Sequence, residues 1–140
     1  MTIDPFPSIL ARYADAVRAK DVAAYLDIYA DDVHIFDMWG AWSLQGIAPW
    51  RAMTGEWFTS LGTEYVTVAF DAAHAVGDDH LVIGHAFITY TAFSAENRRL
   101  RSMSNRLTMA LQQRAGAWKI IHQHTSAPID GATMQATLQR

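Results

Sequence analysis

Apolar residues recur at helical spacing in two segments near the N-terminus. The first segment predicts a helix over residues 4–19, where Asp4 can cap the N-terminus and Pro5 suits the first turn. Its apolar stripe consists of Leu10, Tyr13, Ala14 and Val17. Asp21 can cap a second, shorter helix. The apolar face of that helix consists of Val22, Tyr25, Leu26 and Tyr29.

A short strand and a third helix are predicted next. Residues 33–39 are typical of a strand, and residues 40–46 are typical of a loop. Pro49 then begins a helix whose apolar residues are Trp50, Trp57, Phe58 and Leu61. Gly62 suits the position just after the last turn, where glycine commonly ends a helix.

From residue 64 the period of the pattern changes to two, which indicates strands. Four long strands are predicted, at residues 65–76, 79–93, 101–114 and 118–126. Helices followed by hairpin-linked strands are typical of an α+β fold. We therefore predict a strongly bent antiparallel sheet with three N-terminal helices over one face, enclosing a pocket. The chain reads as one domain over residues 1–140, regular at about 4–128, with a loose tail at 129–140.

The first hairpin predicts which residues of the middle strands face the pocket. Gly77-Asp78 reads as a two-residue turn. This register places His85, Phe87 and Thr89 on the same face as Val66, Val68 and Phe70. We expect His85, Phe87 and Thr89 to contact a ligand, although a lone histidine is also common as a satisfied core residue.

The last hairpin leaves the side of two histidines open. A two-residue turn at 115–116 pairs Met109 with His122 and Leu107 with His124, so that both histidines point into the pocket. A β-bulge would instead send them to the outer face and turn Gln123 and Thr125 inward. We take His122 as a catalytic candidate, and Met109 and His124 as ligand contacts. Structural histidines, a proton relay and half of a metal site are the alternatives.

The composition predicts more buried apolar surface than an ordinary core contains. The 140-residue chain is 51% hydrophobic and 18% charged, with five tryptophans, whereas typical domains are about 25% charged. We expect the surplus to line a ligand cavity, a homodimer interface, or both. Trp39 and Trp57 are candidates for the cavity mouth, although core packing explains them as well.

Several classes of function are excluded or disfavoured. The absence of cysteine excludes disulfides, thiolate metal sites and cysteine nucleophiles. A net charge of −3 argues against a general nucleic-acid binder. No signal-peptide pattern and no apolar run of about 20 residues is present, so we expect a cytoplasmic protein without a membrane partner. No phosphate-binding glycine loop and no cysteine is present, so we expect no cofactor. We expect no resident metal either, because short histidine motifs match by chance too often.

Asp37 is the most informative polar residue. It lies among Ile, Phe, Met and Trp on an apolar strand, on the same side as Val33 and Ile35. An apolar setting disfavours the carboxylate and raises its pKa, which suits a base that works near neutral pH. The alternative is an aspartate at a strand end that caps a loop or faces water.

The segments Tyr29–Gly40 and Gly116–Pro128 resemble the nuclear transport factor 2-like superfamily. The superfamily includes ketosteroid isomerases, SnoaL-like polyketide cyclases and kinase association domains. The resemblance covers about residues 9–128 and implies a cone-shaped α+β roll, also called cystatin-like, with a deep pocket and usually a dimer. It is specific for the fold and weak for function, because one fold hosts many activities.

The resemblance also implies roles for two residues. In ketosteroid isomerases the general base stands at the place of Asp37, and a helical tyrosine at the place of Tyr13 donates to the developing oxyanion. The second, protonated carboxyl group of that site has no counterpart in Leu107–Leu111. Steroid isomerisation itself is therefore not expected.

Two functions remain after this comparison. In the first, Asp37 abstracts a proton alpha to a carbonyl of a mostly apolar substrate, Tyr13 binds the enolate oxygen, and His122 or His85 assists. In the second, the chain is a non-catalytic small-ligand or dimeric association module, and Asp37 merely orients the ligand.

Overall fold

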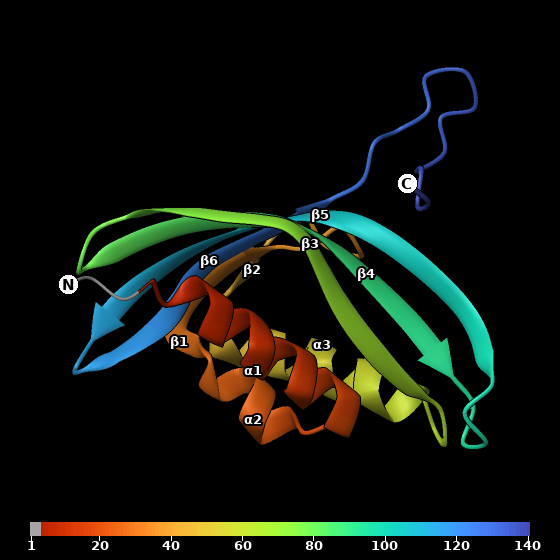
Figure 1. The fold of residues 1–140 in the computed structure, drawn as a ribbon, viewed down its shortest axis with the longest axis horizontal. Helices are drawn as coiled ribbons and strands as arrows, with labels where there is room; N and C mark the ends of the chain where they lie inside the picture. Colours follow the sequence, from red (N-terminus) through yellow and green to blue (C-terminus); the bar gives the residue numbers. More distant parts are fainter. Residues whose placement is uncertain (1–3) are drawn as a thin grey trace.

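Residues 4–140 are described by a computed structural model, which has three helices and six strands (Figure 1). The helices are α1 (Phe6–Ala19), α2 (Val22–Asp27) and α3 (Ile47–Ser60). The strands are β1 (Tyr29–Phe36), β2 (Leu44–Gln45), β3 (Tyr65–Gly77), β4 (Leu81–Phe93), β5 (Arg99–Arg114) and β6 (Ala117–Ser126). The order matches the prediction, and the short β2 lies inside the expected loop.

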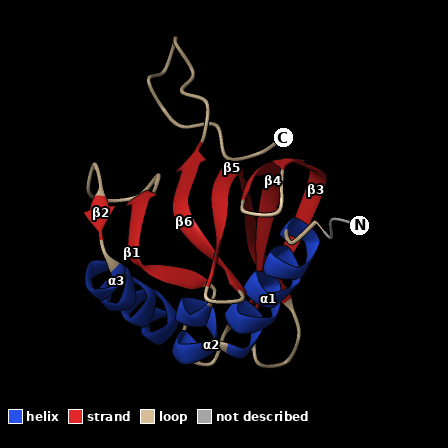
Figure 2. Cartoon of the chain, turned by 90° about the vertical axis from the view of Figure 1, so that its left-hand side faces the viewer, coloured by secondary structure: helices blue, strands red, loops and turns tan. Residues whose placement is uncertain are grey.

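The strands form one curved sheet in the order β2-β1-β6-β5-β4-β3. The sheet arches over the helices, which cover its concave face (Figures 1 and 2). The α+β prediction of a strongly bent sheet with N-terminal helices is therefore confirmed. One pairing departs from a purely antiparallel sheet, because β1 runs parallel to β6.

Local signals in the sequence account for the ends of the helices. The Asp4 carboxylate accepts a hydrogen bond from the Phe6 N–H at 2.9 Å, next to the start of α1. Asp21 caps α2, accepting from the Ala24 N–H at 3.0 Å. After α3, Gly62 takes a positive φ of 58°, the left-handed conformation that glycine adopts without strain. None of the helices in the described part of the chain is long and apolar enough to span a membrane.

A bulge in β3 reverses the predicted face of the middle strands. Near the turn Gly77 pairs with Val82, but beyond a register shift between Asp71 and His74 the strand is offset by one residue. A one-residue offset turns every following side chain to the other face. The prediction that His85, Phe87 and Thr89 share a face with Val66, Val68 and Phe70 is therefore wrong. Val66, Val68 and Phe70 instead pair with Ala92, Tyr90 and Ile88, respectively.

A second bulge decides the orientation of β6. The tight turn at 115–116 is present, with Arg114 paired to Ala117. The register then shifts, so that Leu111 pairs with Ile120 but Ala110 pairs with His122. As a result Gln123 and Thr125 are buried, and His122 and His124 lie on the outer face. Of the two registers considered from the sequence, the bulged one is correct.

The last residues return to the body of the molecule. Ile129 bridges Ala136, and the Ser104 N–H donates to the Leu138 carbonyl at 2.8 Å. The Arg140 guanidinium lies 3.1 Å from the Asp71 carboxylate. These contacts tie the C-terminal segment, expected to be loose, to the edge of β5 and to β3.

Gly84 of β4 lies directly against the side chain of Phe6 in α1. A Cβ atom at this position would lie 2.7 Å from the ring of Phe6, which is fully buried. We expect Gly84→Ala to lower the free energy of unfolding by about 1–3 kcal/mol, because overpacking forces the ring and the helix to move. Urea denaturation measures this change.

Gly55 provides the matched control. It lies inside α3 with nothing near its added Cβ. Gly55→Ala should therefore stabilise the protein by up to about 1 kcal/mol through the helix propensity of alanine. Equal effects of the two substitutions would contradict the close packing at Gly84.

Candidate functional site

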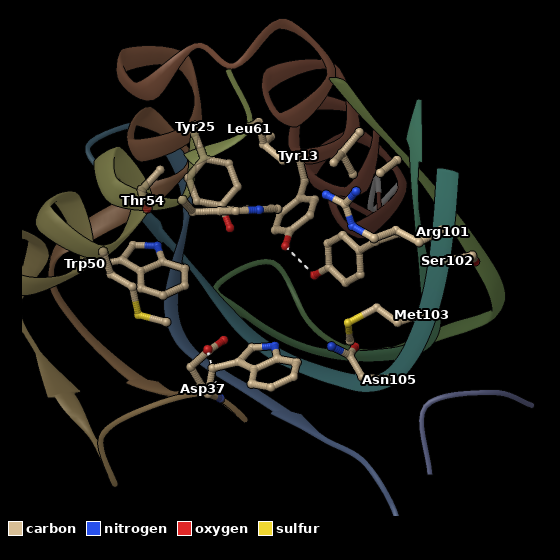
Figure 3. Close-up of a pocket in the computed structure, with 16 residues that line it drawn as sticks. Tyr13, Tyr25, Asp37, Trp50, Thr54, Leu61, Arg101, Ser102, Met103 and Asn105 are labelled. Atoms are coloured by element: carbon tan, nitrogen blue, oxygen red, sulfur yellow. Dashed lines mark hydrogen bonds between the residues drawn. The ribbon is translucent and has the colours of Figure 1, made fainter. Parts of the chain in front are cut away.

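A cavity of about 490 Å³ lies between the helices and the concave face of the sheet. Aromatic side chains from several elements form much of its wall: Tyr13 from α1, Tyr25 from α2, Trp50 and Trp57 from α3, and Tyr90 from β4 (Figure 3). Trp39, which is half exposed, lies at the mouth. The cavity can therefore enclose a flat apolar molecule of moderate size.

Asp37 places a carboxylate in this wall, one residue after β1 ends (Figure 3). Burial raises its pKa above the ordinary carboxyl value. Two hydrogen bonds of 3.2 Å oppose that rise, one from the Trp39 N–H and one from the Thr125 hydroxyl. Among the residues that line the cavity within 4–140, Asp37 carries the sole carboxyl group. It is therefore a base with a raised pKa in apolar surroundings.

Hydroxyl groups of buried tyrosines lie on the other side of the cavity. The Tyr13 and Tyr90 oxygens are 2.7 Å apart (Figure 3). Burial raises the pKa of Tyr13, while hydrogen bonding with Tyr25 and Tyr90 opposes this. A phenol whose oxygen accepts from its neighbours keeps its own proton to donate. Tyr13 can therefore act as a neutral hydrogen-bond donor at neutral pH.

Four tyrosines, Tyr13, Tyr25, Tyr29 and Tyr90, form a tyrosine group at the cavity. Gln123 anchors this tyrosine group to the sheet. The Tyr29 hydroxyl donates to the Gln123 side-chain oxygen at 2.7 Å and lies 3.2 Å from the Tyr25 hydroxyl. Gln123 is buried because of the bulge in β6. The same bulge thus positions Thr125 beside Asp37 and Gln123 beside the tyrosines.

Some buried polar atoms of the cavity wall have no protein partner. Within the described chain these atoms are Trp50 Nε1, Thr54 Oγ1 and Asn105 Oδ1. The Trp50 indole lies near the Tyr29 hydroxyl and lowers the pKa of that phenol. All three residues line the same cavity, so the unsatisfied hydrogen-bonding capacity is concentrated there.

The structure brings together one part of the predicted site. Tyr13, Asp37, Trp39 and Trp57 all line the cavity. Met109 is on the inner face but is fully buried in the core, and it is not among the residues that line the cavity. It is held away from a ligand by the side chains packed around it.

The other predicted residues lie on the outer face, as the two bulges require. His85 is exposed beside His74, and the Thr89 hydroxyl bonds the Ser104 hydroxyl at 2.8 Å. Phe87 lies under the guanidinium of Arg140, 3.8 Å away. His122 bonds the His34 carbonyl through Nδ1 at 2.7 Å, and His124 contacts Phe36. Their predicted place in the cavity is wrong.

Metal coordination was an alternative for the histidines. Asp37 faces inward while His122, His124 and His85 face outward, so these four do not converge. In residues 4–140 no group of three or more histidine, aspartate or glutamate side chains could hold a metal ion.

Sequence reasoning turned Tyr90 to the outer face, since it follows Thr89 in the strand, and it did not single out Asn105 as a cavity residue. Both lie on the inner face of long alternating strands, and the face of a strand cannot be read without the position of its bulge. Arg101 also lies at the cavity, where its guanidinium is paired with the Glu64 carboxylate at 2.7 Å.

A sequence model of the SnoaL-like domain matches residues 7–130. The chain belongs to the SnoaL-like domain family. No curated protein matches it.

Solved structures similar to this SnoaL-like domain share the fold. An NTF2-like protein of unknown function from Pseudomonas putida KT2440 is 22% identical, covers 96% of this chain and 92% of its own, and has a TM-score of 0.83. A Xanthomonas campestris protein, named provisionally as a calcium/calmodulin-dependent protein kinase II association domain, is 18% identical, with coverages of 88% and 85% and a TM-score of 0.70. An NTF2-like superfamily protein from Salmonella enterica serovar Typhimurium LT2 is 14% identical, with coverages of 94% and 94% and a TM-score of 0.70. At these identities the likeness establishes the fold alone.

The raised pKa of Asp37 makes a prediction about stability. The folded protein binds this proton more tightly than the unfolded chain, so stability falls as pH rises through the folded-state pKa. Asn cannot ionise, so Asp37→Asn removes this pH-dependent loss of stability. We expect a higher melting temperature than wild type at pH 7 and a difference that disappears by about pH 4, near the ordinary carboxyl pKa.

Asp32 provides a control of opposite sign. A hydrogen bond from Arg114 lowers the pKa of this exposed carboxyl group. Its stabilising effect is present at neutral pH and is lost as pH falls through that lowered pKa. Asp32→Asn should therefore lower the melting temperature slightly at pH 7. A lower melting temperature for Asp37→Asn than for wild type at pH 7 would contradict the claim that burial of the Asp37 carboxylate destabilises the fold.

Proposed function

We propose that this SnoaL-like protein is a cofactor-independent enzyme of the isomerase or cyclase type. Its reaction would begin with abstraction of a proton alpha to a carbonyl group. The observation that carries the proposal is a carboxyl group of raised pKa and a neutral phenol pair in one apolar cavity. A base and a hydrogen-bond donor on two sides of a cavity are what enolisation requires.

The proposed step uses Asp37 as the base. Its carboxylate takes the proton as the C–H bond breaks. The electron pair of that bond forms the C=C bond of the enolate, and the π pair of the carbonyl group moves onto its oxygen. The protonated Asp37 then returns the proton to carbon, so no co-reactant is consumed. The raised pKa supports this role, because proton transfer in both directions is easiest when the pKa of the base lies near the working pH.

The Tyr13 hydroxyl would stabilise the enolate oxygen. Its pKa is raised, so the phenol stays protonated and donates without losing its proton. Tyr90 supports this geometry through the 2.7 Å contact between the two hydroxyl oxygens. His122 and His85, which we expected to assist, lie on the outer face and take no part in the proposed step.

Deuterium exchange tests the proposal. In D2O the protein should catalyse exchange at C2 of 1-tetralone, a cyclic ketone small enough for the cavity, as followed by proton NMR. We expect Asp37→Asn to lower the catalysed rate by about 10²–10⁴-fold. Tyr13→Phe should lower it by about 10²-fold through loss of one donor to the oxyanion.

Tyr65→Phe is the matched control for the tyrosine variant. The Tyr65 hydroxyl bonds Asn97 in an exposed setting away from the cavity. This variant should exchange at the wild-type rate. Exchange that persists at the wild-type rate in Asp37→Asn would exclude Asp37 as the base.

A binding and association module is the second candidate. Its support comes from the outer face of the sheet, where apolar and histidine side chains form continuous cross-strand rows. One row runs through Val76, Ile83, Ala110, His122 and His34. Val76 is 62% exposed and Ile83 is 48% exposed. Exposed apolar surface of this kind is typical of an interface, and we propose that a second copy of the chain covers it.

Substitution on this face tests the proposed homodimer. Ile83→Asp should convert a dimer into monomers, because burying an unpaired carboxylate in the interface is costly. Sedimentation equilibrium measures the mass. Ala95→Asp, in the exposed β4–β5 loop, should leave the mass unchanged. A monomeric wild-type protein would exclude the interface.

A further inference from the structure

Asn105 presents a buried acceptor atom to the cavity. The residue is on the inner face of β5, is 6% exposed and lines the cavity. Its side-chain oxygen has no hydrogen-bond partner in the described chain. A buried carbonyl oxygen without a donor is unfavourable, so this atom is suited to a donor supplied by a ligand.

The neighbours of Asn105 fix which end of its amide faces the cavity. The Nδ2 group lies 3.2 Å from the sulfur of Met38, a weak acceptor. Reversing the amide would place its oxygen against the lone pairs of that sulfur. The oxygen is therefore the atom left for a ligand.

The surroundings of the cavity limit the kind of donor. The wall is mostly aromatic, and the Arg101 guanidinium lies at the cavity, paired with Glu64. Arg101 would repel a cationic ligand. Such a ligand would also lose its hydration shell, and Asp37 is the one carboxyl group among the described lining residues that could compensate for that loss. A neutral hydroxyl group on an apolar frame satisfies Asn105 at the lowest desolvation cost.

We infer that the cavity selects hydroxylated cyclic ketones, with the ligand hydroxyl donating to Asn105 Oδ1. The inference rests on the proposed function only for the ketone, whose oxygen would lie at Tyr13. Asn105 is then the residue that determines specificity, because an analogue unable to donate leaves its oxygen unpaired. Discrimination of this kind, through an unpaired polar group of the site, is stronger than discrimination by size alone.

A pair of ligands isolates the hydroxyl hydrogen. 6-Hydroxy-1-tetralone and 6-methoxy-1-tetralone share the same ring system, and only the first can donate. Dissociation constants are measured by isothermal titration calorimetry at pH 6, with the phenol neutral. The wild-type protein should prefer the hydroxy compound by about tenfold, the usual worth of one buried hydrogen bond.

Two variants at Asn105 test the assignment. Asn105→Leu should reduce the preference to about one without lowering the melting temperature, because it removes an unpaired buried atom from the free protein. If the leucine variant does not fold, the ratio of the two dissociation constants is measured with Asn105→Ala instead. Measuring the ratio rather than one affinity cancels effects of cavity shape.

Thr54→Val is the matched control. It removes a different partnerless polar atom, buried to 2% exposure on another wall of the same cavity, and it should leave the preference intact. A preference that survives in Asn105→Leu, one that is lost in Thr54→Val, or equal binding of both ketones by the wild type would overturn the inference. The measurement involves no turnover. Absence of deuterium exchange with an intact preference would therefore count against the proposed reaction and not against Asn105.

Discussion

The extra residue in β6, between Ile120 and His122, decides which chemistry the cavity contains. It turns Gln123 and Thr125 inward and the two histidines outward. Thr125 then donates to Asp37, and Gln123 accepts from the tyrosine group. Without that residue the same strand would present imidazoles to the ligand. The inward placement of Gln123 and Thr125 therefore depends on a single irregularity in β6.

Asp37 is the clearest unfavourable group in this arrangement. Its two hydrogen bonds of 3.2 Å do not offset the cost of burial, so the carboxylate destabilises the fold at neutral pH. The unpaired oxygen of Asn105 is a further unfavourable group in the same wall. Concentrating such groups in one cavity is typical of a functional site.

The parts of the fold that the sequence predicts are those with local causes. Asp21 and Gly62 mark helix ends through their own backbone chemistry, and Asp37 stands out as a carboxyl group in an apolar strand. Strand faces depend on register, and the bulges near Ala72 and Ile121 carry no recognisable residue signal. His85 was therefore assigned to the wrong face, and the face of His122 was left open. Tyr90 was turned outward, and Asn105 was missed.

The central claim is that Asp37 is a base held in apolar surroundings by Thr125. Carbon-13 NMR titration of the Asp37 carboxyl group tests this most directly. The account predicts a pKa above the ordinary carboxyl value in the wild-type protein, because burial outweighs the two hydrogen bonds. It also predicts a further rise in Thr125→Val, which removes one hydrogen bond to the carboxylate. An ordinary pKa for Asp37, unchanged by that substitution, would contradict the account.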